Sequence, residues 1–146
     1  MPIGCSTIMK TIVNKSFSKI SDTDILSLIK TVRKGINFNH FLNIAASSSF
    51  DLHEWSYVLH LSERTMQRYK KESISFEPIQ SEKILQVALI FQKGYDVFGS
   101  EIKFTHWMST ENLALGGSKP KELLDTTFGM KLIEDELIKI EHGIFT

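Results

Sequence analysis

The chain has 146 residues, of which 42% are hydrophobic and 23% are charged, and its formal net charge at pH 7 is zero. A chain of this length buries about two thirds of its unfolded surface, so it needs no disulfide or cofactor for stability. No apolar run reaches the length of a membrane span, the first residues contain no apolar signal core, and the single cysteine, Cys5, has no partner within the chain. We therefore expect a soluble protein that does not associate with membranes, and its lone cysteine fits a reducing cytosol.

The two halves of the chain carry opposite charge. Residues 1–73 hold seven Lys and three Arg against six acidic residues, which gives +4. Residues 74–146 hold seven Lys and no Arg against eleven acidic residues, which gives −4. This polarity favours nucleic acid as a partner of the first half and a protein as a partner of the second.

The chain begins with a segment that mixes Ser, Thr and Lys with scattered aliphatic residues. We expect residues 1–20 to be flexible, or to form a short element that docks only at its end. Ser21 and Asp22 then offer caps for a first helix, which Gly35 ends. A second helix is expected over residues 37–46.

Residues 51–73 predict two short helices joined by a tight turn. Asp51 caps the first of them and Ser62 the second. On the second helix Met66 and Tyr69 face inward, whereas the outer face carries Arg, Gln and Lys. A helix-turn-helix needs such a pair, because long donors on the second helix reach base edges in the major groove. We predict a helix-turn-helix domain over residues 21–76.

The second half predicts helices throughout. A long helix is expected over residues 77–99, starting near Pro78 and ending at Gly99, and Ser100 caps a short helix after it. In residues 100–146, Gly116-Gly117 predicts a turn, Pro120 a short helix, and the spacing of Met130, Ile133, Leu137 and Ile140 a final helix that Gly143 ends. Because no apolar pattern has a period of two, the expected fold is all-α with about seven or eight helices.

The pattern of residues 104–146 resembles the C-terminal toxin-binding domain of the Xre/MbcA/ParS antitoxin family, in particular of antitoxins paired with RES-domain toxins. Residues 61–69, Leu-Ser-Glu-Arg-Thr-Met-Gln-Arg-Tyr, are similar to the Xre-like helix-turn-helix of the same family. The C-terminal resemblance is carried by Trp107, Asn112, Leu115, Gly116, Gly117, Pro120, Leu123, Leu124, Asp125, Thr126, Gly129, Leu137, Ile140, Glu141, His142 and Gly143.

The resemblance implies an antitoxin of a bacterial type II toxin-antitoxin system. Such a protein would neutralise a RES-domain toxin, which consumes NAD or ADP-ribosylates a target, by covering the active site of the toxin. It would also repress its own operon by binding operator DNA, as a homodimer or a hetero-oligomer with the toxin. The alternative is a plain helix-turn-helix transcriptional repressor whose C-terminal hairpin serves only for homodimerisation.

Three groups of candidate residues follow from the pattern and the resemblance. The DNA contacts are expected at Arg64, Thr65, Gln67 and Arg68, with Lys70 and Lys71 nearer the phosphates. The toxin contacts are expected at Asn112, Leu115, Gly116, Gly117, Lys119, Pro120, Glu141, His142, Gly143, Ile144 and Phe145. The residues expected to hold the C-terminal domain together are Trp107, Leu123, Leu124, Thr126 and Gly129.

No motif of the chain predicts an enzyme. The five histidines lie on different predicted helices, and none forms the pair at i and i+4 that a helical zinc site needs. The carboxylates of residues 134–136 fan out by about 100° each on a helix, so they do not converge on one substrate and suit a solvated or partner-facing edge. We expect no catalytic residue, no metal and no cofactor.

Overall fold

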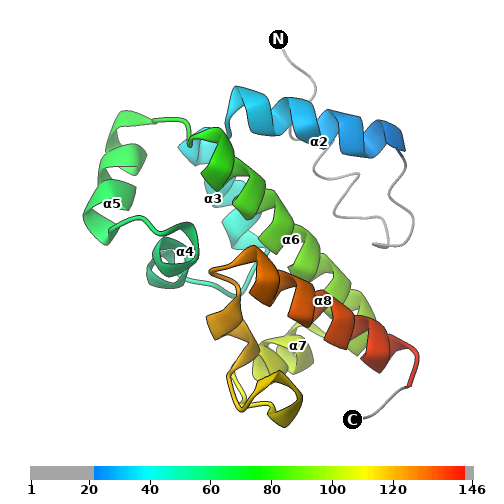
Figure 1. Cartoon of the computed structure of the whole chain (residues 1–146). Helices are drawn as coiled ribbons and strands as arrows, with labels where there is room; N and C mark the ends of the chain where they lie inside the picture. The colour runs from blue at the N-terminus through cyan, green and yellow to red at the C-terminus, as the bar shows by residue number, and fades with distance from the viewer. Residues whose placement is uncertain (1–21, 144–146) are drawn as a thin grey trace. The chain divides into compact units, whose positions relative to one another are not determined.

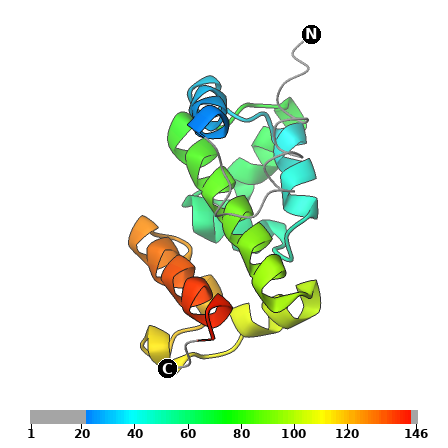
Figure 2. The same cartoon turned by 90° about the vertical axis from the view of Figure 1, so that its right-hand side faces the viewer.

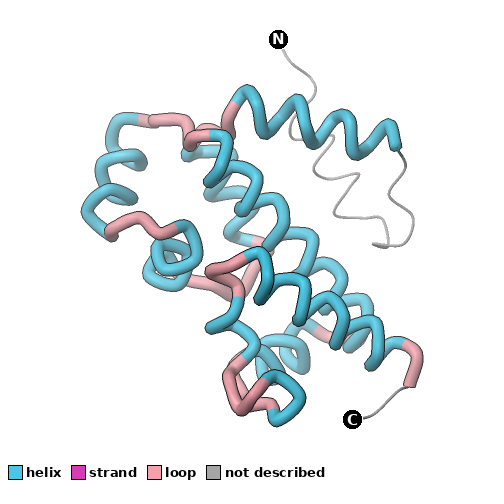
Figure 3. Tube along the Cα trace, in the orientation of Figure 1, coloured by secondary structure: helices cyan, strands magenta, loops and turns pink. Residues whose placement is uncertain are grey.

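The computed structural model of the chain describes residues 22–143, and this part is all-α, as predicted (Figures 1 and 3). The expectations for residues 1–20 and for Ile144 and Phe145 lie outside the described residues. No described helix is long and apolar enough to cross a membrane. The elements are α2 (Asp22–Lys34), α3 (Phe38–Ala46), α4 (Leu52–Leu59), α5 (Glu63–Glu72), α6 (Pro78–Phe98), α7 (Glu101–Met108), the 3-10 helices η2 (Leu113–Leu115) and η3 (Pro120–Leu123), and α8 (Thr127–Glu141).

The chain forms two compact units, the first ending at Leu89 and the second starting at Ile90. Helix α6 contributes its first half to the first unit and its second half to the second. The two units are described separately below.

An aromatic cluster forms the core of the first unit. The ring of Phe41 lies 5.2 Å from that of Trp55 and 5.1 Å from that of Phe76, both at steep angles that aromatic pairs prefer. Phe38 packs against the same rings, 5.2 Å from Phe41 and 5.7 Å from Phe76. Since these rings come from α3, α4 and the connection before α6, the cluster fixes the helix-turn-helix to the rest of the unit.

The second unit is built around Phe104 of α7. Its ring lies 5.5 Å from Phe91 and 5.6 Å from Tyr95, both on α6 and both edge-on to it. Gly94 allows this approach, because a Cβ at that position would lie 2.2 Å from the Phe104 ring. The predicted apolar stripe of α8 is buried in the same unit at Met130, Ile133 and Leu137.

The acidic run on α8 departs from the expected solvated edge. Glu136 is buried, although Glu134 and Asp135 remain half-exposed. The Glu136 carboxylate lies 3.9 Å from the Lys139 ammonium, one turn further along the helix. Glu136 is therefore part of the inner side of α8, and the expectation was wrong for this residue because it lies three residues after the buried Ile133, on the same side of the helix.

Candidate DNA-binding and partner-binding sites

Helices α4 and α5 form the predicted pair, and each begins at the expected cap. The Asp51 carboxylate accepts a hydrogen bond of 2.8 Å from the Glu54 backbone N–H, and the Glu54 side chain accepts one from the Asp51 N–H, so the two form a capping box. The Ser62 hydroxyl accepts from the Thr65 N–H at 3.0 Å. His60 ends α4 in the left-handed conformation, with φ 56°. This turn lets α5 start only four residues after α4 ends.

Helix α5 separates its residues into an inner and an outer face. Met66 is fully buried, and the half-buried Tyr69 ring lies 5.4 Å from Phe76. The predicted DNA contacts on the outer face are exposed, with the exception of Thr65, which is half-buried. The exposed set is Arg64, Gln67, Arg68, Lys70 and Lys71. Helix α5 thus presents a continuous face of long hydrogen-bond donors.

Two contacts shape this face. The Arg68 guanidinium lies 5.5 Å from the centre of the Tyr69 ring, within the range of a cation–π contact. The Thr65 hydroxyl oxygen accepts a 2.9 Å hydrogen bond from the Ser62 hydroxyl, so Thr65 takes part in the cap of α5. Arg64 and Gln67 therefore stand out as the long donors near the start of the helix.

A histidine–carboxylate contact joins the starts of the two helices. Nδ1 of His53 on α4 lies 2.7 Å from Oε1 of Glu63 on α5. The hydrogen bond and the charge of Glu63 raise the pKa of His53 above its ordinary value. When His53 is protonated, it neutralises the acidic residue nearest the donor face of α5.

The glycine-rich loop of the second unit is held by Asn112. Its side-chain oxygen accepts from the Ala114 N–H at 2.9 Å, and its backbone bonds Ser118 and Gly117. Gly116 and Gly117 have φ values of 72° and 80°, a region that residues with a Cβ resist. Both glycines are exposed, and a Cβ on either would meet nothing within 4 Å. Their role is conformational, because the turn needs their positive φ angles rather than extra space.

Two predicted toxin contacts lie beneath this loop rather than on the surface where we expected them. Leu115 and Pro120 are buried, because each turns its side chain into the domain at a 3-10 helix. Lys119, between them, is half-buried. Leu113, at the start of the loop, is 94% exposed and was not among the residues predicted to contact the toxin. Only its place next to the Asn112 cap could have indicated it.

The end of α8 is tied to α6 by an ion pair. The Lys93 ammonium lies 2.6 Å from Oε2 of Glu141, with side-chain exposures of 6% and 40%. The hydrogen bond from Lys93 lowers the pKa of the Glu141 carboxyl. His142 caps the helix, and Gly143 follows with φ 69°. Glu141, predicted as a toxin contact, thus already has a partner within the unit.

Four of the five residues expected to hold the domain together lie at the start of α8 or just before it, and the fifth, Trp107, lies on α7. Leu124 is fully buried, and the Thr126 hydroxyl accepts from the Gly129 N–H at 3.0 Å as the N-cap. Gly129 lies so close to η3 that a Cβ there would stand 1.8 Å from the Leu123 carbonyl oxygen. The ring of the half-buried Trp107 stacks 6.0 Å from Phe104.

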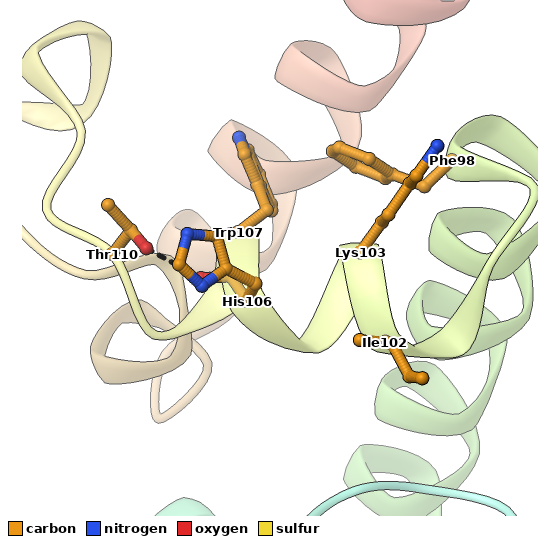
Figure 4. A pocket seen from close by; sticks show the side chains of 6 residues that line it. All are labelled: Phe98, Ile102, Lys103, His106, Trp107 and Thr110. Carbon is orange, nitrogen blue, oxygen red and sulfur yellow. Dashed lines mark hydrogen bonds between the residues drawn. The ribbon is translucent and has the colours of Figure 1, made fainter.

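An apolar hollow runs along α7 in the second unit (Figure 4). It is lined by Phe98, Ile102, Lys103, His106, Trp107 and Thr110. The Thr110 hydroxyl donates to the His106 carbonyl oxygen at 2.7 Å. Within residues 22–143 no three His, Cys, Asp or Glu side chains are grouped so that they could hold a metal ion.

Further apolar residues are exposed on α8. Phe128 and Leu132 lie one turn apart and point away from the buried stripe. The sequence contains the signal for this, since Phe128 is about 200° around the helix from Met130. An apolar residue opposite an apolar stripe marks an exposed position.

A helix-turn-helix with an exposed donor face, followed by a second helical unit, defines a two-domain helix-turn-helix protein. Residues 27–89 match the family described as the antitoxin Xre-like helix-turn-helix domain. Residues 93–143 match the family described as the antitoxin Xre/MbcA/ParS C-terminal toxin-binding domain.

These two matches together cover most of the described residues, and the chain belongs to the Xre/MbcA/ParS antitoxin family. A protein named antitoxin Xre from Yersinia enterocolitica (serotype O:8, biotype 1B) is 27% identical to it over 120 residues. The alignment covers 82% of this chain and 81% of that relative.

Proposed function

We propose that this antitoxin neutralises a RES-domain toxin, which consumes NAD or ADP-ribosylates a target, by covering its active site, and that it represses its own operon by binding operator DNA. We assign DNA binding to residues 21–76, toxin binding to residues 100–146, and the connection to the helix over residues 77–99. The observation that carries the proposal is the division of the chain into a helix-turn-helix unit and a separate helical unit that match two antitoxin domains. On this proposal the protein acts by binding, without chemistry of its own.

The toxin-facing surface is centred on the loop that Asn112 holds. A surface that covers an active site needs an apolar anchor on a rigid support with a polar rim. Leu113 supplies the anchor, the Asn112 hydrogen bonds supply the rigidity, and Gly116 and Gly117 let the backbone approach closely. Leu115 and Pro120 act from beneath by holding the loop in shape, and Lys119 lies at its far end.

The end of α8 completes this surface. We assign His142 and Gly143, and Ile144 and Phe145 after them, to the toxin contact, and Glu141 holds the end of α8 through its ion pair with Lys93. Removing residues 143–146 should therefore abolish neutralisation while leaving the helices folded. A shortened chain that still protects cells from the toxin would contradict the role of this end.

A matched pair of exposed aliphatic residues tests the loop itself. Leu113→Ser should weaken toxin binding, whereas Ile102→Ser, at an equally exposed position on α7, should leave it unchanged. Neither side chain is buried, so both variants should retain the thermal stability of the wild type. Equal affinities for the two variants would move the toxin contact away from the loop.

On the DNA side, the outer face of α5 enters the major groove of the operator. Arg64, Gln67 and Arg68 reach base edges, Thr65 supports the start of the helix, and Lys70 and Lys71 contact phosphates. The exposed position of the five long side chains supports this assignment. The positive charge of the two arginines and two lysines among them also favours operator binding at low salt.

A plain transcriptional repressor remains the second candidate, favoured by the exposed Phe128 and Leu132 on α8. Such an apolar pair suits an isologous contact between two copies, which would bring two recognition helices to half-sites one DNA turn apart. This candidate requires a homodimer without a stoichiometric protein partner.

The deciding experiment is purification of the tagged protein from its native cell, with mass spectrometry and light scattering of the eluate. A stoichiometric partner whose NAD-consuming activity appears only after separation supports the antitoxin proposal. A homodimer that elutes alone and binds its own promoter supports the repressor instead.

A further inference from the structure

Helix α2 carries more apolar surface than its neighbours in the first unit cover. Ile25, Leu26 and Ile29 remain 45%, 60% and 38% exposed, although the helix has only 13 residues. Of the residues of α2 whose side chains are described, only Thr31 is buried. A helix with such a surface needs a further partner to bury its apolar side.

The uncovered residues border a groove between α2 and the first half of α6. Figures 1 and 2 show these two helices next to each other within the first unit. The apolar walls are Ile25, Leu28, Ile29 and Val32 from α2, and Leu85 and Leu89 from α6. Leu26, although exposed, does not border the groove.

We propose that the N-terminal segment of this same chain, residues 8–20, occupies the groove between α2 and α6. The segment joins α2 directly, and Ile25 lies only five residues after Ile20. Such a short tether gives the segment a high effective concentration at the groove, well above that of a separate molecule. Thirteen residues span about 20 Å even when fully helical, which matches the length of the 13-residue helix α2.

The composition of the segment fits an apolar groove with a charged edge. Its apolar residues recur every three to five positions at Ile8, Ile12, Phe17 and Ile20. Between them stand lysines at positions 10, 15 and 19, and residues 1–20 contain no acidic side chain. Glu82 borders the groove and is exposed, so it can receive one of these lysines, although Arg33 on the α2 side adds a like charge.

Paramagnetic broadening tests the proposal in the full-length chain. Cys5→Ser removes the native thiol, and Thr11→Cys places a spin label in the segment. The label should broaden the methyl signals of Ile29 and Leu85 more strongly than those of Leu26, which lies on the same helix but does not border the groove. A segment that is tethered but not docked would broaden Leu26 as strongly as Ile29, and this result would overturn the proposal.

Pairs of variants that introduce the same charge at neighbouring positions show whether the segment binds the groove or only lies near it. Phe17→Asp should abolish the selective broadening, whereas Ser16→Asp adds the same charge at a polar position and should preserve it. On the groove side, Ile29→Asp should abolish the broadening of Leu85, and Leu26→Asp should not. Equal responses within either pair would contradict the assignment of these residues.

A mixed sample identifies which copy fills the groove. Isotope-labelled Cys5→Ser chain is mixed with spin-labelled chain at natural isotope abundance. The proposal expects no broadening in this mixture, because each groove holds its own segment. Selective broadening in the mixture would show that the segment of a second copy covers the groove, and no broadening in either sample would show that the segment is not bound there; both results refute the proposal.

Discussion

The contact between Gly129 and η3 offers a direct test of how the second unit is packed. A Cβ at position 129 would stand 1.8 Å from the Leu123 carbonyl oxygen and 2.7 Å from its carbonyl carbon. To restore an allowed separation of 3.0 Å, the backbone of η3 must move by about 1.2 Å relative to α8. The obstacle is backbone rather than a flexible side chain, and the adjacent Leu124 is fully buried, so this movement disturbs the core.

Two opposing effects decide the stability of Gly129→Ala. Alanine gains about 1 kcal/mol over glycine in a helix interior. Overpacking a tight contact typically costs about 1–3 kcal/mol and occasionally more. Since the Thr126 cap fixes the start of α8 and leaves little room to shift, we expect the packing cost to prevail. The net loss should be about 1–2 kcal/mol, and the displaced η3 should weaken toxin binding as well.

Urea denaturation followed by circular dichroism measures this loss as a lower midpoint with an unchanged slope. Thr127→Ala is the control, since it also replaces a weaker helix former by alanine, two residues away at an exposed position. If Gly129→Ala proves as stable as the Thr127→Ala protein, the close packing of η3 on α8 is refuted.

The remaining predictions concern charges. Glu141→Ala should destabilise the second unit by roughly 1–3 kcal/mol, because it leaves the buried Lys93 ammonium without its partner. Lys93→Met should destabilise it less, and thermal melts of the two variants show which one is less stable. Lys93 lowers the pKa of Glu141 from its ordinary 4.5, so the stabilisation from this ion pair should be fully present above pH 4.5 and be lost as the pH falls through the lowered pKa. The Glu141→Gln variant should show a weaker dependence of stability on pH in this range. Because the pKa of His53 is raised, its contact with Glu63 should stabilise the helix-turn-helix fully below pH 6.5, and this stabilisation should be lost as the pH rises through the raised pKa. An NMR titration should show a lower His53 pKa in the Glu63→Gln variant than in the wild type. Arg68→Ala should weaken operator binding by roughly 1–3 kcal/mol if the contact is bidentate to guanine, whereas an equal loss on every DNA sequence with a smaller salt slope would indicate a phosphate contact.

The helices could be predicted because their ends are encoded locally. Asp51, Ser62 and Ser100 were all expected as caps, and each accepts the expected backbone hydrogen bond. Thr126 caps α8 in the same way, with its side chain accepting from the Gly129 N–H. Caps and apolar spacing depend on neighbours within four residues, and the sequence displays these directly.

Burial within the candidate sites could be predicted less well. Leu115 and Pro120 were expected at the surface, and their burial depends on how η2 and η3 fold back against the domain. The pairing of Lys93 with Glu141 joins residues 48 positions apart, a separation that no local pattern reports. Periodicity identifies which side of a helix is apolar, but it does not show whether another element covers that side.

Open space surrounds Gly116 and Gly117, so the chirality of the residue at each position matters more than the volume of its side chain. An L-residue at either position is strained by the positive φ, although nothing stands in the way of its side chain. A D-alanine would adopt the same backbone angles without strain and would restrict the unfolded chain, a gain of about 0.4–1 kcal/mol for each site. In a chemically synthesised domain, D-residues in this loop would therefore increase the stability of the protein without changing its backbone conformation.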